Sequence, residues 1–163
     1  MEILERISQR LNLWLMVVGG LFLVAMILLT CGNILLREVW VPIRGTFELM
    51  GFFGAIVTTF ALGYTQIKKG HIAVDVLINS FPAGVRRLLK IVNSSLGAFF
   101  FALVTWQMVI KGLTLWRTGE VTETLRIIYH PFTFAVAVGC GVLALVFIVD
   151  LFAALSPPKE EQR

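Results

Sequence analysis

Charged residues are scarce in this chain, and this scarcity indicates which solvent surrounds it. Only 15% of its 163 residues are Asp, Glu, Lys or Arg, whereas 58% are hydrophobic and the mean hydropathy is +0.87. A soluble domain of this size has too small an interior to bury so much apolar surface. The net charge of +4 does not indicate nucleic acid, because the basic residues lie at the ends of apolar runs. The composition therefore predicts an integral membrane protein.

Side chains that bind metals or carry redox chemistry are also few. Cys31 and Cys140 sit inside apolar runs without a pairing motif or metal-ligand spacing, which is typical of thiols that pack as small hydrophobic groups. His71 and His130 are expected at opposite faces of the bilayer, roughly 30 Å apart, so they cannot ligate one haem iron. The sequence has no GxxxxGK phosphate-binding motif. We therefore expect no cofactor, no metal and no enzymatic activity in this chain.

Ionisable side chains are missing from the middle of every apolar run. Glu48 and Asp150 lie close to the ends of their runs. The deeper polar residues are uncharged and are mainly Thr30, Asn33, Thr58, Thr59, Thr105 and Gln107. A transporter that works alone binds substrate or ions near the bilayer midplane, often between broken half-helices. We therefore expect no substrate-binding residue, and we do not expect the chain to translocate a substrate by itself.

Four apolar runs are present, at about residues 13–36, 49–67, 91–110 and 129–155. Each is close to or above the ~20 residues that a helix needs to cross a bilayer. The first run is too long for a signal peptide and lacks a small-residue cleavage site, so it is interpreted as a span. The sequence predicts an all-α integral membrane protein with four transmembrane helices, forming a single membrane domain over residues 1–163.

The basic residues predict the orientation of these spans. Four spans put both termini and the loop at residues 68–90 on one side, which carries nine Lys and Arg residues against five on the other. Cytoplasmic segments are enriched in Lys and Arg. Both termini and this loop are therefore expected in the cytoplasm.

The loop at residues 68–90 has two parts. In its second half and just beyond, apolar residues recur at helical spacing opposite a basic and polar side. The apolar set is Val85, Leu88, Leu89 and Val92, and the other set is Arg86, Arg87, Lys90 and Asn93. This pattern predicts an amphipathic helix lying in the membrane interface between spans two and three. His71 and Asp75, one helical turn apart, form either a local pair or a contact with a partner.

Small residues recur along one side of the second span. They are Gly51, Gly54, Ala55 and Thr58, followed by Ala61. Side chains of this size let another helix approach closely. We therefore expect this side of the span to pack against protein.

Several of these residues together resemble a known family. Arg37, Trp40 and Glu48 precede the second span, Gly70-His71-Ile72 and Asp75 follow it, and Phe81-Pro82 and Arg86-Arg87 precede the third. This succession is similar to the small membrane subunit, DctQ type, of tripartite ATP-independent periplasmic (TRAP) transporters, and the likeness covers nearly the whole chain. Its most specific part is the set Gly70, His71, Asp75, Pro82, Arg86 and Arg87. Many relatives have a Trp and two adjacent acids before the second span, whereas this chain has only Glu48 there.

The resemblance implies a role in sodium-coupled import. It implies a bacterial inner-membrane scaffold subunit that supports a large membrane subunit of the DctM type. That large subunit would hold the substrate and sodium sites and move by an elevator mechanism. A periplasmic binding protein would deliver an organic acid, a carboxylate or a sulfonate. The strip Gly51, Gly54, Ala55 and Thr58 would then pack against the large subunit.

The two outer loops, residues 37–48 and 111–126, would be available to help dock the binding protein. The candidate docking residues are Arg37, Arg44, Glu48 and Glu120. The alternative interpretation of the chain is a membrane anchor or electron-transfer subunit of an unrelated membrane complex.

Overall fold

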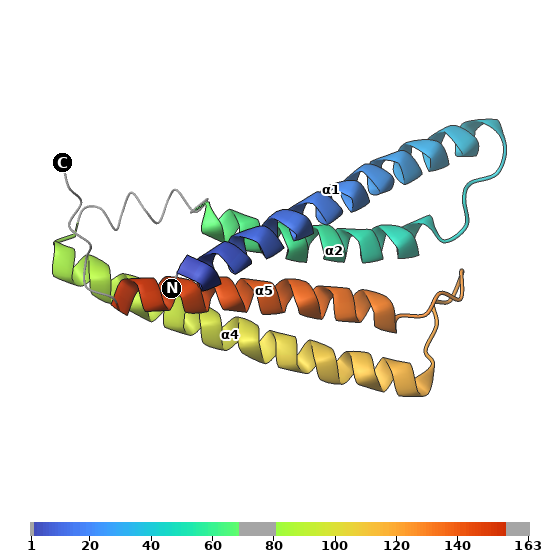
Figure 1. Ribbon diagram of the computed structural model, residues 1–163. Helices are drawn as coiled ribbons and strands as arrows, with labels where there is room; N and C mark the ends of the chain where they lie inside the picture. Colours follow the sequence, from blue (N-terminus) through green and yellow to red (C-terminus); the bar gives the residue numbers. More distant parts are fainter. Residues whose placement is uncertain (1, 69–80, 156–163) are drawn as a thin grey trace.

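Four long helices make up the part of the protein that the structure describes. The computed structural model describes residues 2–68 and 81–155. Its helices are α1 (Glu2–Val39), α2 (Thr46–Ile67), α4 (Ala83–Thr118) and α5 (His130–Leu155), labelled in Figure 1. Each is long and apolar enough to cross a membrane. The prediction of an all-α membrane protein with four transmembrane helices is confirmed.

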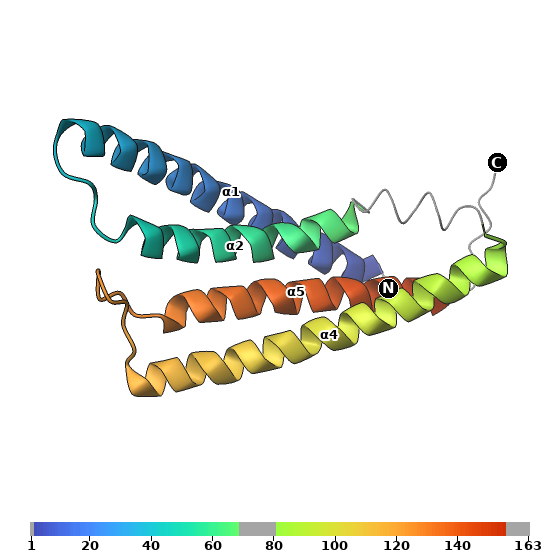
Figure 2. The ribbon, with the colours of Figure 1, turned by 180° about the vertical axis from the view of Figure 1, so that it is seen from behind.

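Helix α5 lies at the centre of the arrangement. It packs against the other three helices, while α1 packs mainly on α2 and, among the described elements, α4 contacts α5 alone. Figures 1 and 2 show α5 between α2 and α4, with α1 crossing α2 and diverging from it toward the α1–α2 connection. Most buried hydrophobic residues belong to α5 or to the side of α2 that faces it. They include Ile56, Phe60, Ala137, Cys140, Leu143, Ala144, Val146 and Phe147.

Glycines let the helices approach closely at several contacts. A Cβ atom on Gly139 of α5 would lie 2.9 Å from the Thr59 Cβ, and one on Gly97 of α4 would lie 2.6 Å from the Phe147 ring. A Cβ on Gly63 of α2 would collide with the Asn12 side chain of α1. Lipid tails are as apolar as the helices, so such close packing, rather than hydrophobic burial, holds membrane helices together.

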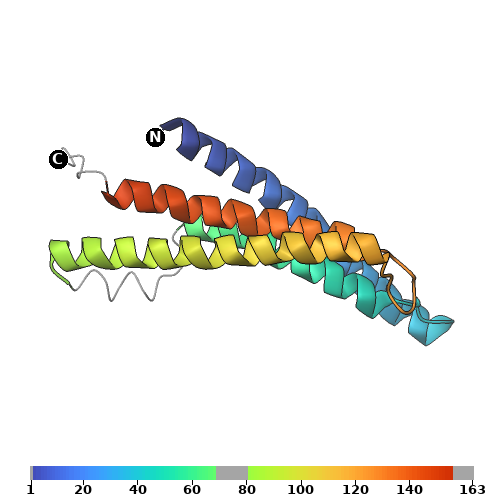
Figure 3. The ribbon, with the colours of Figure 1, turned by 90° about the horizontal axis from the view of Figure 1, so that it is seen from below.

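Helix α4 is longer than the predicted third span. It runs unbroken through 36 residues, and Figure 3 shows it as one straight helix. The predicted helix at residues 85–92 is therefore the start of α4 and not a separate element, because no proline interrupts the chain between Ala83 and Thr118. Its position in the membrane interface remains a prediction. A helix of this length measures about 54 Å and exceeds the ~30 Å hydrocarbon core, so its charged ends extend beyond the core.

Side-chain hydrogen bonds join the helices at the end where α4 begins. The Arg87 guanidinium on α4 donates to the carbonyl oxygens of Ala154 and Leu155, at 3.0 and 2.9 Å. These carbonyls end α5, where a helix has no further amide donors and a cation is favourable. Gln66 of α2 donates to Asp150 of α5 at 3.1 Å. Together these bonds tie α4 and α2 to the last turns of α5.

The contact between Gly63 and Asn12 can be tested with Gly63→Ala. Asn12 is fully buried, and the added methyl group would take the place of its Oδ1 atom. Overpacking of this kind costs about 1–3 kcal/mol, so we expect a lower melting temperature for the protein purified in detergent.

Gly51→Ala is the matched control for this measurement, because a Cβ atom on Gly51 meets nothing within 4 Å. It should leave the melting temperature unchanged or raise it slightly, since Ala favours helix more than Gly does. An equal loss of stability in both variants would contradict the proposed contact.

Candidate functional site

The end of the molecule opposite Arg87 is formed by two connections, and the first joins α1 to α2. The Ile43 amide donates to the Asn33 Oδ1 atom at 2.8 Å, and the Thr46 hydroxyl donates to the Ile43 carbonyl at 2.7 Å. Gly45 adopts a left-handed backbone with φ of 73°, which glycine tolerates without strain. The connection is therefore fixed on both sides of Ile43.

The second connection joins α4 to α5 and folds back on itself. The Thr122 amide donates to the Ile127 carbonyl at 2.9 Å, and the Ile127 amide donates to the Thr122 hydroxyl at 3.1 Å. Val121 and Ile128 form an isolated antiparallel bridge just outside this pair. Arg126, with φ of 52°, is the one non-glycine residue with a positive φ among the described residues. The result is a tight turn whose tip is exposed.

Glu48 joins the two connections. Its carboxylate accepts hydrogen bonds from the Thr124 amide at 2.7 Å and the Leu125 amide at 3.1 Å. Hydrogen bonds to an ionised acceptor are roughly twice as strong as neutral ones. Leu125 also packs so tightly over Gly45 that a Cβ atom there would collide with it. Glu48 thus has a structural role that its candidacy as a docking residue did not anticipate.

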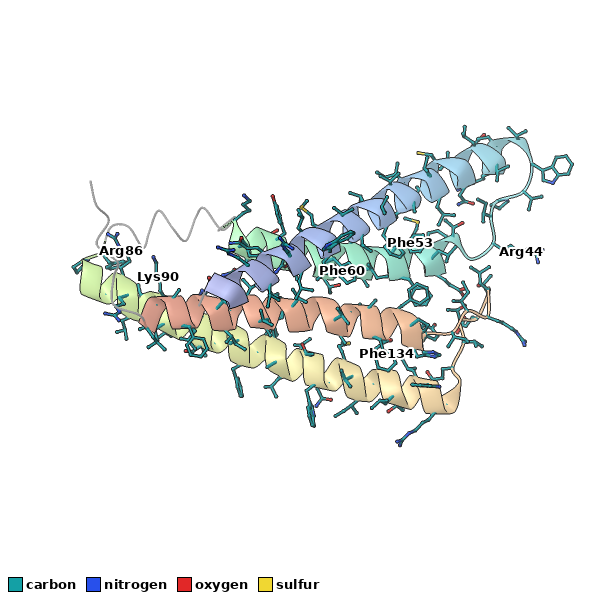
Figure 4. The ribbon with its side chains drawn as sticks, in the orientation of Figure 1. Arg44, Phe53, Phe60, Arg86, Lys90 and Phe134 are labelled. Carbon is teal, nitrogen blue, oxygen red and sulfur yellow. The ribbon has the colours of Figure 1, made fainter. Side chains whose placement is uncertain are left out.

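The other predicted docking residues are exposed at this same end. Arg37 lies in the last turn of α1, Arg44 in the α1–α2 connection and Glu120 just after α4. Figure 4 shows Arg44 at this end and Arg86 and Lys90 at the opposite one. The fold therefore brings both signs of charge to one end of the molecule, where a soluble partner could reach them.

The strip of small residues on α2 lies on its outer side. Gly51, Ala55 and Thr58 are exposed and Gly54 is half-buried, whereas Ile56 and Phe60 face the other helices. A Cβ atom on Gly51 or on Gly54 would meet nothing within 4 Å. The protein's own helices therefore leave this strip uncovered.

The loop motif lies partly outside the described residues, which do not include Gly70, His71 and Asp75. Pro82 caps the start of α4 with an extended backbone. Arg86 donates to the Phe81 carbonyl at 3.3 Å, and Arg87 holds the end of α5. The described half of the motif therefore fixes the start of α4 and, through Arg87, joins it to the last residues of α5.

No side chains in the described ranges 2–68 and 81–155 gather in a way suited to a metal ion. The His130 ring stacks on Trp116 at 5.8 Å between centroids and meets Phe134 edge-on at 6.4 Å. Cys140 is buried and Cys31 is exposed. The His130 ring thus lies among aromatic side chains.

Sequence reasoning missed the residues that organise this end. Thr122, Leu125 and Asn33 look like ordinary loop or span residues, and their partners lie up to 77 positions away in the chain. The one local signal is Gly45 close before an acidic residue, which marks a turn but does not reveal what the acid binds.

Comparison with known proteins identifies a family. A family model described as "Tripartite ATP-independent periplasmic transporters, DctQ component" matches residues 26–156. No curated protein and no solved structure matches the chain.

Glu48→Ala tests the link between the two connections. Loss of the carboxylate leaves the Thr124 and Leu125 amides without their acceptor, so we expect residues 119–129 to exchange amide hydrogens roughly tenfold faster. Hydrogen exchange followed by mass spectrometry measures this. Glu48→Gln keeps one acceptor oxygen, so its exchange rate should fall between those of the unaltered protein and Glu48→Ala. Glu123→Ala, an exposed acid in the same turn, should leave exchange unchanged; an effect as large as that of Glu48→Ala would contradict the assignment.

Proposed function

The chain belongs to the DctQ component family of tripartite ATP-independent periplasmic transporters, and we propose that it is the immobile scaffold for the large membrane subunit. The DctQ family is one of transporter subunits and not of enzymes. The chain is accordingly a small, multi-pass membrane subunit of a TRAP transporter. In the proposed complex the large subunit, of the DctM type, holds the sodium and substrate sites.

The observation that carries this proposal is the uncovered strip on α2. Gly51, Ala55 and Thr58 present a flat side to the membrane although α2 already packs on α1 and α5 with its other sides. Helix interfaces in membranes are enriched in small residues. A helix of the large subunit is the proposed occupant of the strip.

The polar groups of the spans favour a scaffold role over a transport role. The hydroxyls of Thr58, Thr59 and Thr105 donate to carbonyls of their own helices. Asp150, near the end of α5, accepts from Gln66. These groups are engaged within the chain, so the organic acid and sodium are assigned to the partner subunit.

Bonds at both ends of the bundle suit an immobile part. The Glu48 carboxylate fixes one end, and Arg87 and the pair of Gln66 and Asp150 fix the other. An elevator-type partner moves across the membrane and needs a frame that does not follow it. In the proposed arrangement the chain lies in the bacterial inner membrane with both termini cytoplasmic, as the distribution of Lys and Arg favours.

Gly51→Leu tests the strip as the contact with the large subunit. A bulky side chain there would prevent close approach, and we expect less large subunit to co-purify. Its affinity should fall roughly fivefold to a hundredfold, because overpacking costs about 1–3 kcal/mol and each 1.4 kcal/mol is tenfold in affinity. The control is Gly20→Leu, because Gly20 is exposed on α1 and a Cβ there also meets open space. Full retention of the large subunit by Gly51→Leu would remove the strip from the interface.

The scaffold role itself is tested by reconstitution. Liposomes containing this chain alone should take up no organic acid in a sodium gradient, whereas liposomes with both membrane subunits and the binding protein should. Uptake by the chain alone would refute the proposed function.

The exposed charges at the outer end are the proposed docking site for the binding protein. We expect Arg44→Glu to lower the rate of sodium-driven uptake roughly threefold to tenfold at low salt, with a smaller effect at high salt, because such charges act chiefly on association. Arg37→Glu and Glu120→Lys should act in the same direction. The membrane complex should still co-purify. Lys90→Glu, an exposed cation at the opposite end, is the control, and unchanged uptake in all three outer variants would exclude docking by this chain.

A further inference from the structure

The connection between α1 and α2, together with the helix ends that flank it, carries the most exposed large hydrophobic side chains among the described residues. Phe47 is 87% exposed, Trp40 82% and Val39 81%, and Val41 beside them is also exposed. We call these four residues the aromatic patch. Residues 39–41 are consecutive and Phe47 begins the next helix, and soluble proteins rarely leave several large apolar side chains uncovered in one region. An apolar environment is therefore expected around this patch.

The backbone under the aromatic patch is held in place. The Trp40 amide donates to the Leu36 carbonyl at 2.7 Å, and Asn33 and Thr46 bind the backbone of Ile43. The Glu48 carboxylate fixes the start of α2 against the second connection. The connection thus satisfies these polar groups within the chain, while its largest apolar side chains make no such contact and stay exposed.

The aromatic patch continues a ridge along α1. Trp14, Leu21, Leu28 and Leu35 recur every seven residues, and each is about two-thirds exposed. Val39 follows Leu35 after one helical turn, on the same side. Only 6% of the most apolar window of α1 is buried within the protein. This ridge is the surface that α1 offers to lipid, and the patch is its end.

Cations accompany the two aromatic residues. Arg37 precedes Trp40 by three positions, Arg44 precedes Phe47 by three, and both arginines are exposed. Trp combined with Arg is typical of the zone between hydrocarbon and headgroups, where a ring is partly buried and a guanidinium stays in water. This composition favours the bilayer interface over a soluble partner as the environment of the patch.

We propose that the aromatic patch inserts into the interface of the bilayer leaflet at this end of the protein. It anchors the α1–α2 connection at a fixed depth and keeps Arg37 and Arg44 at the membrane surface, open to water and to docking proteins. This inference needs only the membrane spans and does not depend on which complex the chain joins.

Tryptophan fluorescence in nanodiscs tests the depth of the patch. The full chain would carry Trp14→Phe, Trp106→Phe and Trp116→Phe, leaving Trp40 as the single fluorophore, in lipids brominated at different acyl positions. We expect the strongest quenching from bromines nearest the headgroup, which corresponds to a depth about 15 Å from the midplane, half the hydrocarbon thickness. Phe47→Trp in a background with all four native tryptophans replaced by Phe reports independently and should give the same depth.

The matched control is Phe100→Trp in that same background. Phe100 is exposed in the middle of the charge-free part of α4, so it should be quenched best by bromines near the chain ends. Quenching of Trp40 by iodide in water but by none of the brominated lipids would overturn the proposal. Lipid quenching that disappears when the large subunit is co-expressed would assign the patch to that partner and would also overturn it. Neither result would refute the scaffold function, which the reconstitution tests separately.

Discussion

The structure depends on one constraint, that polar groups inside a bilayer have no water to bind. Every backbone amide and carbonyl in the hydrocarbon must therefore pair within the protein, and helices satisfy this requirement one segment at a time. The threonines of the spans obey the same rule, since Thr58, Thr59 and Thr105 donate to carbonyls of their own helices. Because these hydroxyls are bonded within their own helices, the contacts between the helices depend on complementary shape. Glycines facing large side chains, such as Gly97 against Phe147, supply that shape.

The same constraint moves the long-range polar bonds to the two ends of the bundle. Glu48 binds amides 76 and 77 positions away, and Arg87 binds carbonyls 67 and 68 positions away. The ends of a membrane-spanning bundle lie nearest the headgroups and water, so an ionised group there carries less desolvation cost than at the midplane. Each bond joins elements that share no local sequence. Close packing therefore joins the helices along the bundle, and hydrogen bonds of charged side chains join them at its ends. This arrangement is the one expected of a rigid support.

The four spans were predictable from the sequence because partition into a bilayer depends directly on hydropathy. A run of about 20 apolar residues has few stable structures there other than a helix. The sequence was insufficient for the length of α4, since Arg86, Arg87 and Lys90 end the apolar run while the helix continues through them. Hydropathy predicts which residues lie in the membrane, but it does not predict where the helix begins and ends. The Glu48 carboxylate was recognisable as an acid near a span, but its partners are backbone amides, which carry no residue-type signal. The central position of α5 also depends on packing that no local pattern encodes.

The glycines of the spans divide into two classes, and this division separates the faces of the molecule. In the first class, atoms of a neighbouring helix occupy the space that a side chain would take, as at Gly63, Gly97 and Gly139. Glycine weakens a helix by about 1 kcal/mol relative to Ala, and packing within the chain offsets this cost. Gly51 and Gly54 have no such compensation, and internal packing gives no reason for them. The exposed ridge of α4, by contrast, consists of bulky residues such as Phe99, Leu103 and Trp106, which suit fluid lipid and would obstruct a closely packed helix. One side of α2 thus carries small side chains that permit close approach of a helix, as the proposed scaffold role requires, whereas the outer side of α4 carries bulky ones.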